Sequence, residues 1–218
     1  MPAPCRVPLL CLASASPRRR ELLGQLGVPH VLAVPNIDEA MLAAESAADY
    51  VVRMARAKAR IVHPHGIGLP VLAADTTVLI DELICGKPAN AEEGIALLLK
   101  LSGRSHEVLT AVALAAAGEV NHRLSRSEVR FRHLSLAEAI AYWNTGEPYD
   151  KAGGYAVQGH GAVFVEHLSG SYSGVMGLPL FETAELLASA AAVASPLAPN
   201  ASARPRPMKM MPMFSTVW

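Results

Sequence analysis

The junction between an apolar strand and a helix near the N-terminus constrains the fold more than any other feature of this sequence. Residues 7–13 form a continuous apolar run of strand length, and Ser16 and Pro17 follow it closely. Serine is a preferred N-cap and proline a preferred first helical residue, so we expect a helix to begin here. Its leucines form one apolar stripe, and Gly27 supplies a stop signal. A buried strand that leads directly into a helix is typical of an α/β domain.

The rest of the chain alternates between strand and helix patterns in the same way. Strands are predicted at residues 30–35 and 70–80, two long strands joined near Gly118 at residues 106–134, and helices at residues 47–62, 91–101, 136–144 and 182–193. We expect one α/β domain over residues 1–194, or two small lobes that share a cleft. Residues 195–218 mix proline, methionine and a few basic residues without periodicity, which predicts a disordered tail.

The charge balance argues against whole classes of partner. The 19 basic and 19 acidic residues cancel, so the net charge indicates neither a nucleic acid nor a membrane surface as partner. No apolar run in the sequence reaches the roughly 18 residues that a membrane-spanning helix needs. The first residues share features with a signal peptide, but a short apolar run before an arginine cluster favours a buried strand. Three cysteines without metal-ligand spacing suit small core residues in a reducing compartment, and we predict a cytoplasmic protein.

Three consecutive arginines stand in the first turn of the predicted N-terminal helix. Arg18, Arg19 and Arg20 lie where the helix dipole disfavours cations, so a bound anion would explain them. Ser14 and the free amide groups of the first turn lie at the same strand-to-helix junction, where α/β folds place ligands. Guanidinium groups bind phosphate oxygens through paired hydrogen bonds. We interpret the junction as a phosphate site, the alternative being a solvated basic helix end.

Asp75 is the first candidate for a catalytic role. It follows apolar residues within AADTTV, at the point where we expect the strand at 70–80 to leave the core. A carboxylate there can hold Mg²⁺ or polarise a water molecule, and hydrolysis of a phosphoanhydride requires both acts. The alternative, which so short a motif leaves open, is an aspartate that caps a turn.

Four other polar residues are weaker candidates when each is considered alone. Glu39 is an acidic loop residue that could reach a metal ion. Lys58, in the basic helix, and Lys87, in CGKP, could bind an anion, although single lysines are more often solvated. His106 is better explained as a hydrogen-bonding residue at a strand end than as a metal ligand, and no histidine cluster in the sequence indicates zinc.

Residues 150–181 are rich in glycine. Glycine permits positive φ angles and lets the backbone approach a planar or anionic group closely. Gln158, within this segment, offers both a donor and an acceptor to the edge of a nucleobase. The alternative is a structural crossover in which Glu147 pairs with Asp150 or Lys151 on the surface. The sequence alone leaves both interpretations open.

Taken together, these motifs resemble the Maf family of nucleoside triphosphate pyrophosphatases. The matching pieces are LASASPRRRELL, ADTTV, GKP, SGRSHEVLTAV, EPYDKAGGYAVQG and GSYSGVMGLPL, in family order over roughly residues 8–190. The resemblance implies an α/β fold with a mixed twisted sheet, flanking helices and two lobes around a deep cleft. It also implies hydrolysis of a nucleoside triphosphate to the monophosphate and pyrophosphate, with a divalent cation, Mg²⁺ or Mn²⁺.

The resemblance also assigns roles to individual residues. The general base falls on Asp75, and Glu39 is a further carboxylate on the metal side. The phosphate-binding positions fall on Ser14, Arg19, Lys58 and Lys87. The positions associated with the choice of nucleobase fall on Arg18, Thr76 and Gln158. Gly154 stands where the family commonly has alanine, a departure that removes no proposed catalytic group.

The residues at the base-choice positions look like those of the branch associated with dTTP and UTP. A pyrimidine presents a carbonyl and an N–H edge, which the amide of Gln158 can match. The alternatives are a pyrophosphatase for methylated GTP and a non-catalytic nucleotide-binding regulator of cell division, although the retained catalytic residues argue against the regulator. The expected partner is a nucleoside triphosphate, and we expect the protein to bind neither a nucleic acid nor a membrane. A homodimer is compatible with the sequence.

Overall fold

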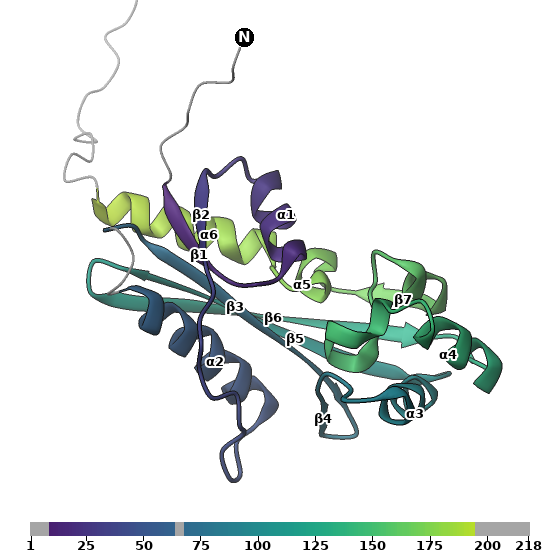
Figure 1. Cartoon of the computed structure of the whole chain (residues 1–218). Coiled ribbons are helices and arrows are strands. Elements are labelled where there is room, and N and C mark those ends of the chain that lie inside the picture. The colour runs from purple at the N-terminus through teal and green to yellow at the C-terminus, as the bar shows by residue number, and fades with distance from the viewer. Residues whose placement is uncertain (1–8, 64–67, 195–218) are drawn as a thin grey trace, which may run out of the picture.

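The computed structural model of the chain describes residues 9–63 and 68–194 (Figure 1). Its centre is a seven-stranded mixed sheet in the order β2-β1-β3-β5-β6-β7, with β4 also paired to β3. The strands are β1 (Leu10–Ala13), β2 (His30–Ala33), β3 (Val71–Ile80), β4 (Leu83–Cys85), β5 (Ser105–Ala116), β6 (Glu119–Phe131) and β7 (Val165–Ser169). β1 pairs in parallel with β2 and β3, and the other pairings are antiparallel. The predicted mixed α/β sheet is confirmed.

Helices flank this sheet on both faces. The α-helices are α1 (Pro17–Gln25), α2 (Ala47–Val62), α3 (Ala91–Leu101), α4 (Leu136–Trp143), α5 (Tyr172–Met176) and α6 (Leu180–Ala194). Short 3₁₀ helices follow α4, namely η2 (Glu147–Asp150), η3 (Ala152–Gly154) and η4 (His160–Phe164). The predicted helices at 47–62 and 91–101 therefore have the expected bounds.

The core divides into two lobes along the long strands β3, β5 and β6 (Figure 1). At one end, α2 packs on one face of the sheet against alanines such as Ala73 and Ala111, whose small side chains let the helix approach closely. α1 and α6 cover the opposite face, where Leu22 and Leu186 share a cluster with strand residues. At the other end, α3, α4, β4 and β7 enclose a third cluster that contains Phe131.

Side-chain caps fix the starts of four helices. Ser46, Asn90, Ser135 and Ser171 each accept a hydrogen bond from the backbone amide three residues further on. α1 is different, because Ser16 at its N-cap makes no side-chain capping bond and its first turn carries no acidic residue. The amide of Ser16 instead donates to Oγ of Ser14 at 3.1 Å. The first turn of α1 therefore keeps the electropositive character that its arginines reinforce.

The long hairpin is confirmed, whereas several short elements, among them β4, β7 and α5, were not predicted. Ala117 and Gly118 have φ angles of 51° and 83° between β5 and β6, as a two-residue hairpin loop requires. β4, β7 and α5 have only three to five residues each, too few to show a periodicity. Among the described residues, no helix is long and apolar enough to cross a membrane. The predicted tail at 195–218 lies outside the described residues.

Candidate active site

A gap in the pairing of β3 lies beside a cleft in the described part of the chain. β1 pairs with β3 up to Ala73, and β4 pairs with β3 only from Val78 onward. Residues 74–77 therefore have a sheet neighbour only on the β5 side. The cleft, about 550 Å³ in volume, opens along this unpaired edge. Because no strand covers the edge, side chains from both faces of β3 reach the cleft.

The cleft brings together every residue to which the sequence resemblance assigns a role. Its lining includes Ser14, Arg18, Arg19, Glu39, Lys58, Asp75, Thr76, Lys87 and Gln158. These residues come from the β1–α1 junction, the loop before α2, α2 itself, β3, and the segments that follow β4 and η3. Only the tertiary fold makes them neighbours.

Lys58 lies between two carboxylates in the cleft. Its Nζ is 2.6 Å from Oδ1 of Asp75 and 2.6 Å from Oε1 of Glu39. The Lys58 and Asp75 side chains are only 9% and 11% exposed, whereas Glu39 is 49% exposed. A buried ammonium requires such partners, because an unpaired charge is costly to remove from water. Lys58 is therefore not the solvated lysine that its place in a basic helix allowed.

Asp75 does not lie at a strand end, and this corrects the sequence-based expectation. β3 continues to Ile80, so Asp75 is in the middle of the strand. The neighbouring strand β1 ends instead, and the carboxylate reaches the cleft at the edge that β1 leaves unpaired. The alternative of a turn-capping aspartate is excluded by the same pairing, because Asp75 is in register with Ala111 of β5.

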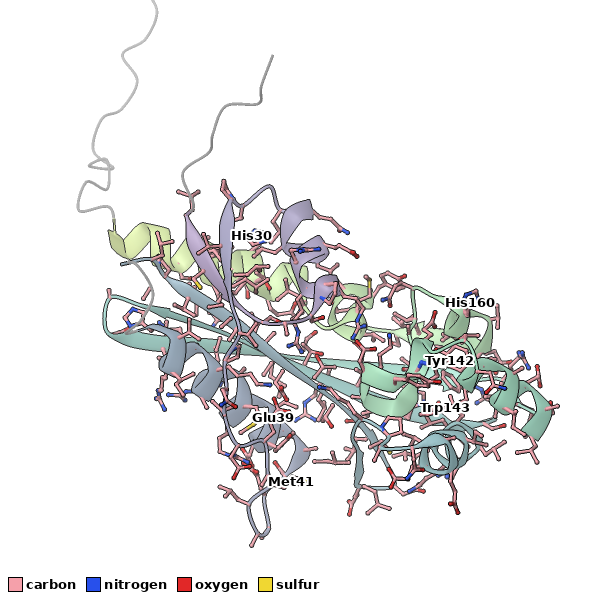
Figure 2. The ribbon with its side chains drawn as sticks, viewed as in Figure 1. His30, Glu39, Met41, Tyr142, Trp143 and His160 are labelled. Atoms are coloured by element: carbon pink, nitrogen blue, oxygen red, sulfur yellow. The ribbon has the colours of Figure 1, made fainter. Side chains whose placement is uncertain are left out.

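Glu39 belongs to the segment that runs beside α2, where Figure 2 shows it. The hydroxyl of Tyr50, on α2, donates to the carbonyl oxygen of Glu39 at 3.0 Å and fixes this segment. Partial burial by itself raises the pKa of Glu39, but the ion pair with Lys58 and the charges of Lys87 and Arg19 outweigh burial. The pKa of Glu39 therefore lies below its ordinary value, and its side chain stays anionic.

The first two arginines of α1 point toward the cleft. Nε of Arg19 donates to the carbonyl oxygen of Gly177 at 2.8 Å, and an amino group of Arg19 donates to Oγ1 of Thr76 at 3.2 Å. Burial lowers the pKa of Arg19 from its ordinary high value. Arg18 forms an ion pair with Asp150, with 3.4 Å between NH1 and Oδ2. This pair joins the two lobes across the cleft.

Lys87 and Gln158 lie on the opposite side of the cleft from α1. Lys87 follows β4, is exposed, and lines the cleft with Gly86. Gln158 follows Val157, which packs into the core of the second lobe, and its own side chain is exposed to the cleft. Both residues line the same cleft as Arg18 and Arg19.

His106 is not part of the cleft lining. Its Nε2 lies 2.9 Å from the hydroxyl of Tyr155, and the ring packs edge-on against Phe131. Burial lowers the pKa of His106 to about 4, so the ring is neutral at physiological pH. The prediction that His106 is a hydrogen-bonding residue near a strand end is confirmed.

Glu147 corrects one interpretation of the glycine-rich segment. Lys151 does pair with Asp150, with 2.6 Å between Nζ and Oδ1. The carboxylate of Glu147, however, accepts from the hydroxyl of Tyr142 and from the amides of His160 and Gly161. The crossover is held by a carboxylate that binds the backbone, not by a surface ion pair of Glu147.

Sequence reasoning missed several residues that shape the cleft. Tyr50 and Tyr155 line it, and Asp150 faces Arg18 across it. The helical spacing of Tyr50 from Lys58, eight residues apart on α2, was a usable signal, because that spacing places both side chains on one helix face. Tyr155 and Asp150 both lie in the matching piece EPYDKAGGYAVQG, but nothing in that stretch indicated that they line the cleft.

Among the described residues, no cluster of three or more histidine, cysteine, aspartate or glutamate side chains is arranged to hold a metal ion. The carboxylates at the cleft are those of Asp75 and Glu39, which share Lys58, and that of Asp150, which pairs with Arg18 and Lys151. Cys11 and Cys85 are buried and free, as expected for small core residues.

Comparison with known proteins places this site in a family. The family model described as Maf-like protein matches residues 9–190. A dTTP/UTP pyrophosphatase of Alkalilimnicola ehrlichii is 53% identical over 186 residues, which cover 83% of this chain and 92% of that protein. Proteins of the same name from Saccharophagus degradans and Bordetella parapertussis are both 51% identical to this chain. The first match covers 82% of this chain and 87% of that protein. The second covers 84% of this chain and 93% of that protein. The chain therefore belongs to the Maf-like protein family.

Proposed function

We propose that this protein hydrolyses nucleoside triphosphates, with dTTP and UTP as preferred substrates, to the monophosphate and pyrophosphate. The similarity to proteins named dTTP/UTP pyrophosphatase supports the reaction class. The observation that carries the proposal is the buried contact of Asp75 with Lys58 at the unpaired edge of β3, with Arg19 of α1 lining the same cleft. This arrangement places a carboxylate beside cations, as hydrolysis of a phosphoanhydride requires.

Asp75 is the proposed general base. Its Oδ1 accepts from Lys58, and this contact fixes the orientation of the carboxylate. Its Oδ2 can then accept a proton from the water molecule that attacks the α-phosphorus. The bond between the α-phosphorus and the bridging oxygen breaks, and pyrophosphate leaves.

The cations and the first turn of α1 bind the phosphates in this proposal. Arg19 uses two of its donors on Gly177 and Thr76 and keeps others for phosphate oxygens. Lys58 and Lys87 neutralise the negative charge that develops on the leaving pyrophosphate. Ser14 and the amides at the start of α1 supply further donors, because a helix N-terminus favours anions.

The donor set fits Mg²⁺ or Mn²⁺ when nucleotide is present. Mg²⁺ is commonly bound by one or two carboxylates together with substrate phosphates, and Asp75 and Glu39 supply two carboxylates. Carboxylate oxygens are hard ligands and do not select zinc. When bound, the cation would supply charge neutralisation at the phosphate oxygens and polarisation of water.

We propose that Arg18, Thr76 and Gln158 contact the nucleobase and determine which base is preferred. The Gln158 amide can match the carbonyl and N–H edge of thymine or uracil. A cationic methylated guanine calls for an aromatic face or a free carboxylate near the base. Neither stands at Arg18, Thr76 or Gln158, and the nearby carboxylate of Asp150 is neutralised by Arg18 and Lys151, so it offers little attraction to a cation.

Pyrophosphate release from a panel of ordinary and modified nucleoside triphosphates tests the proposal. We expect the highest kcat/KM for dTTP and UTP in the presence of Mg²⁺. A higher kcat/KM for methylated GTP would overturn the substrate assignment and keep the reaction class. Nucleotide binding without turnover of any triphosphate would favour a regulator instead.

A further inference from the structure

Two residues outside the cleft hold the loop that carries Gln158. Tyr142, on α4, is buried, and its hydroxyl donates to Oε1 of Glu147 at 2.6 Å. The same hydroxyl oxygen accepts from the amide of Ala156 at 3.1 Å. Glu147 in turn accepts from the amide of Gly161 at 3.0 Å and from that of His160 at 2.8 Å. We call Tyr142 and Glu147 the clamp; Figure 2 shows Tyr142 and His160 in the same part of the second lobe.

The clamp binds the backbone on both sides of Gln158. Its contacts fall two residues before Gln158, at Ala156, and two and three residues after it, at His160 and Gly161. Among the described side chains, none forms a hydrogen bond with that of Gln158. The backbone of the loop therefore decides where the Gln158 amide lies in the cleft.

Two glycines of the loop are required by the clamp. A Cβ atom at Gly159 would overlap Oε2 of Glu147, and one at Gly161 would lie 2.7 Å from the hydroxyl oxygen of Tyr142. The backbone can close on the clamp only because both positions lack a side chain. The glycine-rich segment predicted a close approach of the backbone to a planar or anionic group, and at Gly159 that group is Glu147 of the same chain.

The clamp is also stronger than a pair of neutral contacts. Hydrogen bonds to an ionised carboxylate are roughly twice as strong as neutral ones. Burial alone raises the pKa of Glu147, but the hydrogen bonds from Tyr142, Gly161 and His160 outweigh burial and hold that pKa below its ordinary value. The carboxylate therefore stays ionised and keeps all three donors.

We propose that Tyr142 and Glu147 are positioning residues that set the selectivity for the nucleobase, because they fix the loop that presents Gln158. The inference rests on the proposed function, in which Gln158 contacts the base. Neither clamp residue lines the cleft, so their effect on substrate passes through the loop and not through direct contact.

The test compares Tyr142→Phe, Glu147→Gln, Gln158→Ala and the double variant Tyr142→Phe/Gln158→Ala in steady-state kinetics with UTP and GTP. We expect Tyr142→Phe and Glu147→Gln to raise KM for UTP by about three- to tenfold, the effect of one lost hydrogen bond, with little change in kcat. KM for GTP should stay unchanged. In the Gln158→Ala background, Tyr142→Phe should cause no further rise in KM for UTP.

Glu138→Gln is the matched control. Glu138 is also a carboxylate that accepts from a backbone amide and a hydroxyl, both of Ser135, but it caps α4 away from the cleft. This variant should keep both KM values. Partial unfolding lowers kcat for both nucleotides and leaves KM unchanged, so it cannot imitate the expected result.

Equal effects on UTP and GTP, a loss confined to kcat, or additive effects in the double variant would each overturn the inference. Absence of UTP and dTTP turnover by the unaltered protein is a separate outcome that overturns the proposed function. In that case the affinities for UMP and GMP are measured by calorimetry, which needs no turnover. Tyr142→Phe and Glu147→Gln should then weaken the binding of UMP and leave that of GMP unchanged.

Discussion

The ammonium group of Lys58 on α2 lies 2.6 Å from a carboxylate oxygen of Asp75 on β3. Both side chains are almost fully buried, so the pair links a helix to the sheet at the floor of the cleft. Each partner neutralises the charge of the other in surroundings where an unpaired charge is costly. The proposed catalytic carboxylate is thus also part of the packing of the first lobe.

Asp75→Asn should lower kcat by about a hundredfold or more, because an amide neither accepts the proton nor binds Mg²⁺ well. Pyrophosphate release from dTTP measures the loss. Asp81→Asn is the matched control, because Asp81 is exposed and pairs with Arg104 outside the cleft. Near-normal turnover of folded Asp75→Asn would remove Asp75 from the role of base.

Lys58→Met should abolish turnover and lower the free energy of unfolding by about 3 kcal/mol, because it leaves the buried Asp75 carboxylate without its cation. Urea denaturation measures the change. The double variant Lys58→Met/Asp75→Leu should recover stability, since no buried charge remains at that contact, but not activity. Unchanged stability of Lys58→Met would show that the ion pair contributes little to the fold.

Removal of divalent cations with EDTA should stop turnover, and Mg²⁺ or Mn²⁺ should restore it. Because Asp75 and Glu39 share Lys58, and Asp150 is paired with Arg18 and Lys151, we expect Mg²⁺ to bind weakly until nucleotide phosphates complete its ligands. Calorimetric titration of Mg²⁺ with and without UMP measures this dependence. Restoration by zinc alone would contradict the assignment of hard oxygen ligands.

The neutral, buried His106 predicts a loss of stability in mild acid. Its pKa of about 4 in the folded state lies below the ordinary value near 6.5, so the unfolded chain binds the proton first as the pH falls. The free energy of unfolding should therefore decrease by about 2 kcal/mol between pH 7.5 and pH 5 on account of this group. Urea midpoints at the two pH values measure the decrease. His106→Gln should reduce the pH dependence, whereas His167→Gln, at an exposed position of β7, should not.

Deletion of residues 196–218 should leave kcat/KM for dTTP unchanged. The segment has no core periodicity in the sequence, and the family match ends at residue 190. Kinetics and thermal unfolding of the shortened chain measure the effect. A fall in activity or in the melting temperature would show that the tail packs on the domain.

The long elements followed from the sequence because their periodicity extends over several turns or alternations. α2 and α3 have the predicted bounds, and the hairpin of β5 and β6 turns where Gly118 indicated. β4 and α5 were not predicted, since three to five residues give too few repeats to detect and their conformation depends on β3 and β6.

The sequence by itself determined which residues carry unusual chemistry: a carboxylate after an apolar run, arginines at a helix start and single lysines in distinctive turns. Only the tertiary structure decided that Asp75 is in the middle of a strand, that Lys58 lies between Asp75 and Glu39, and that Glu147 binds backbone amides beside Gln158. The reason is physical. Residue types and local periodicity are properties of short stretches of chain, whereas the early end of β1 beside β3 and the ion pair of residues far apart in sequence arise when separate elements pack together.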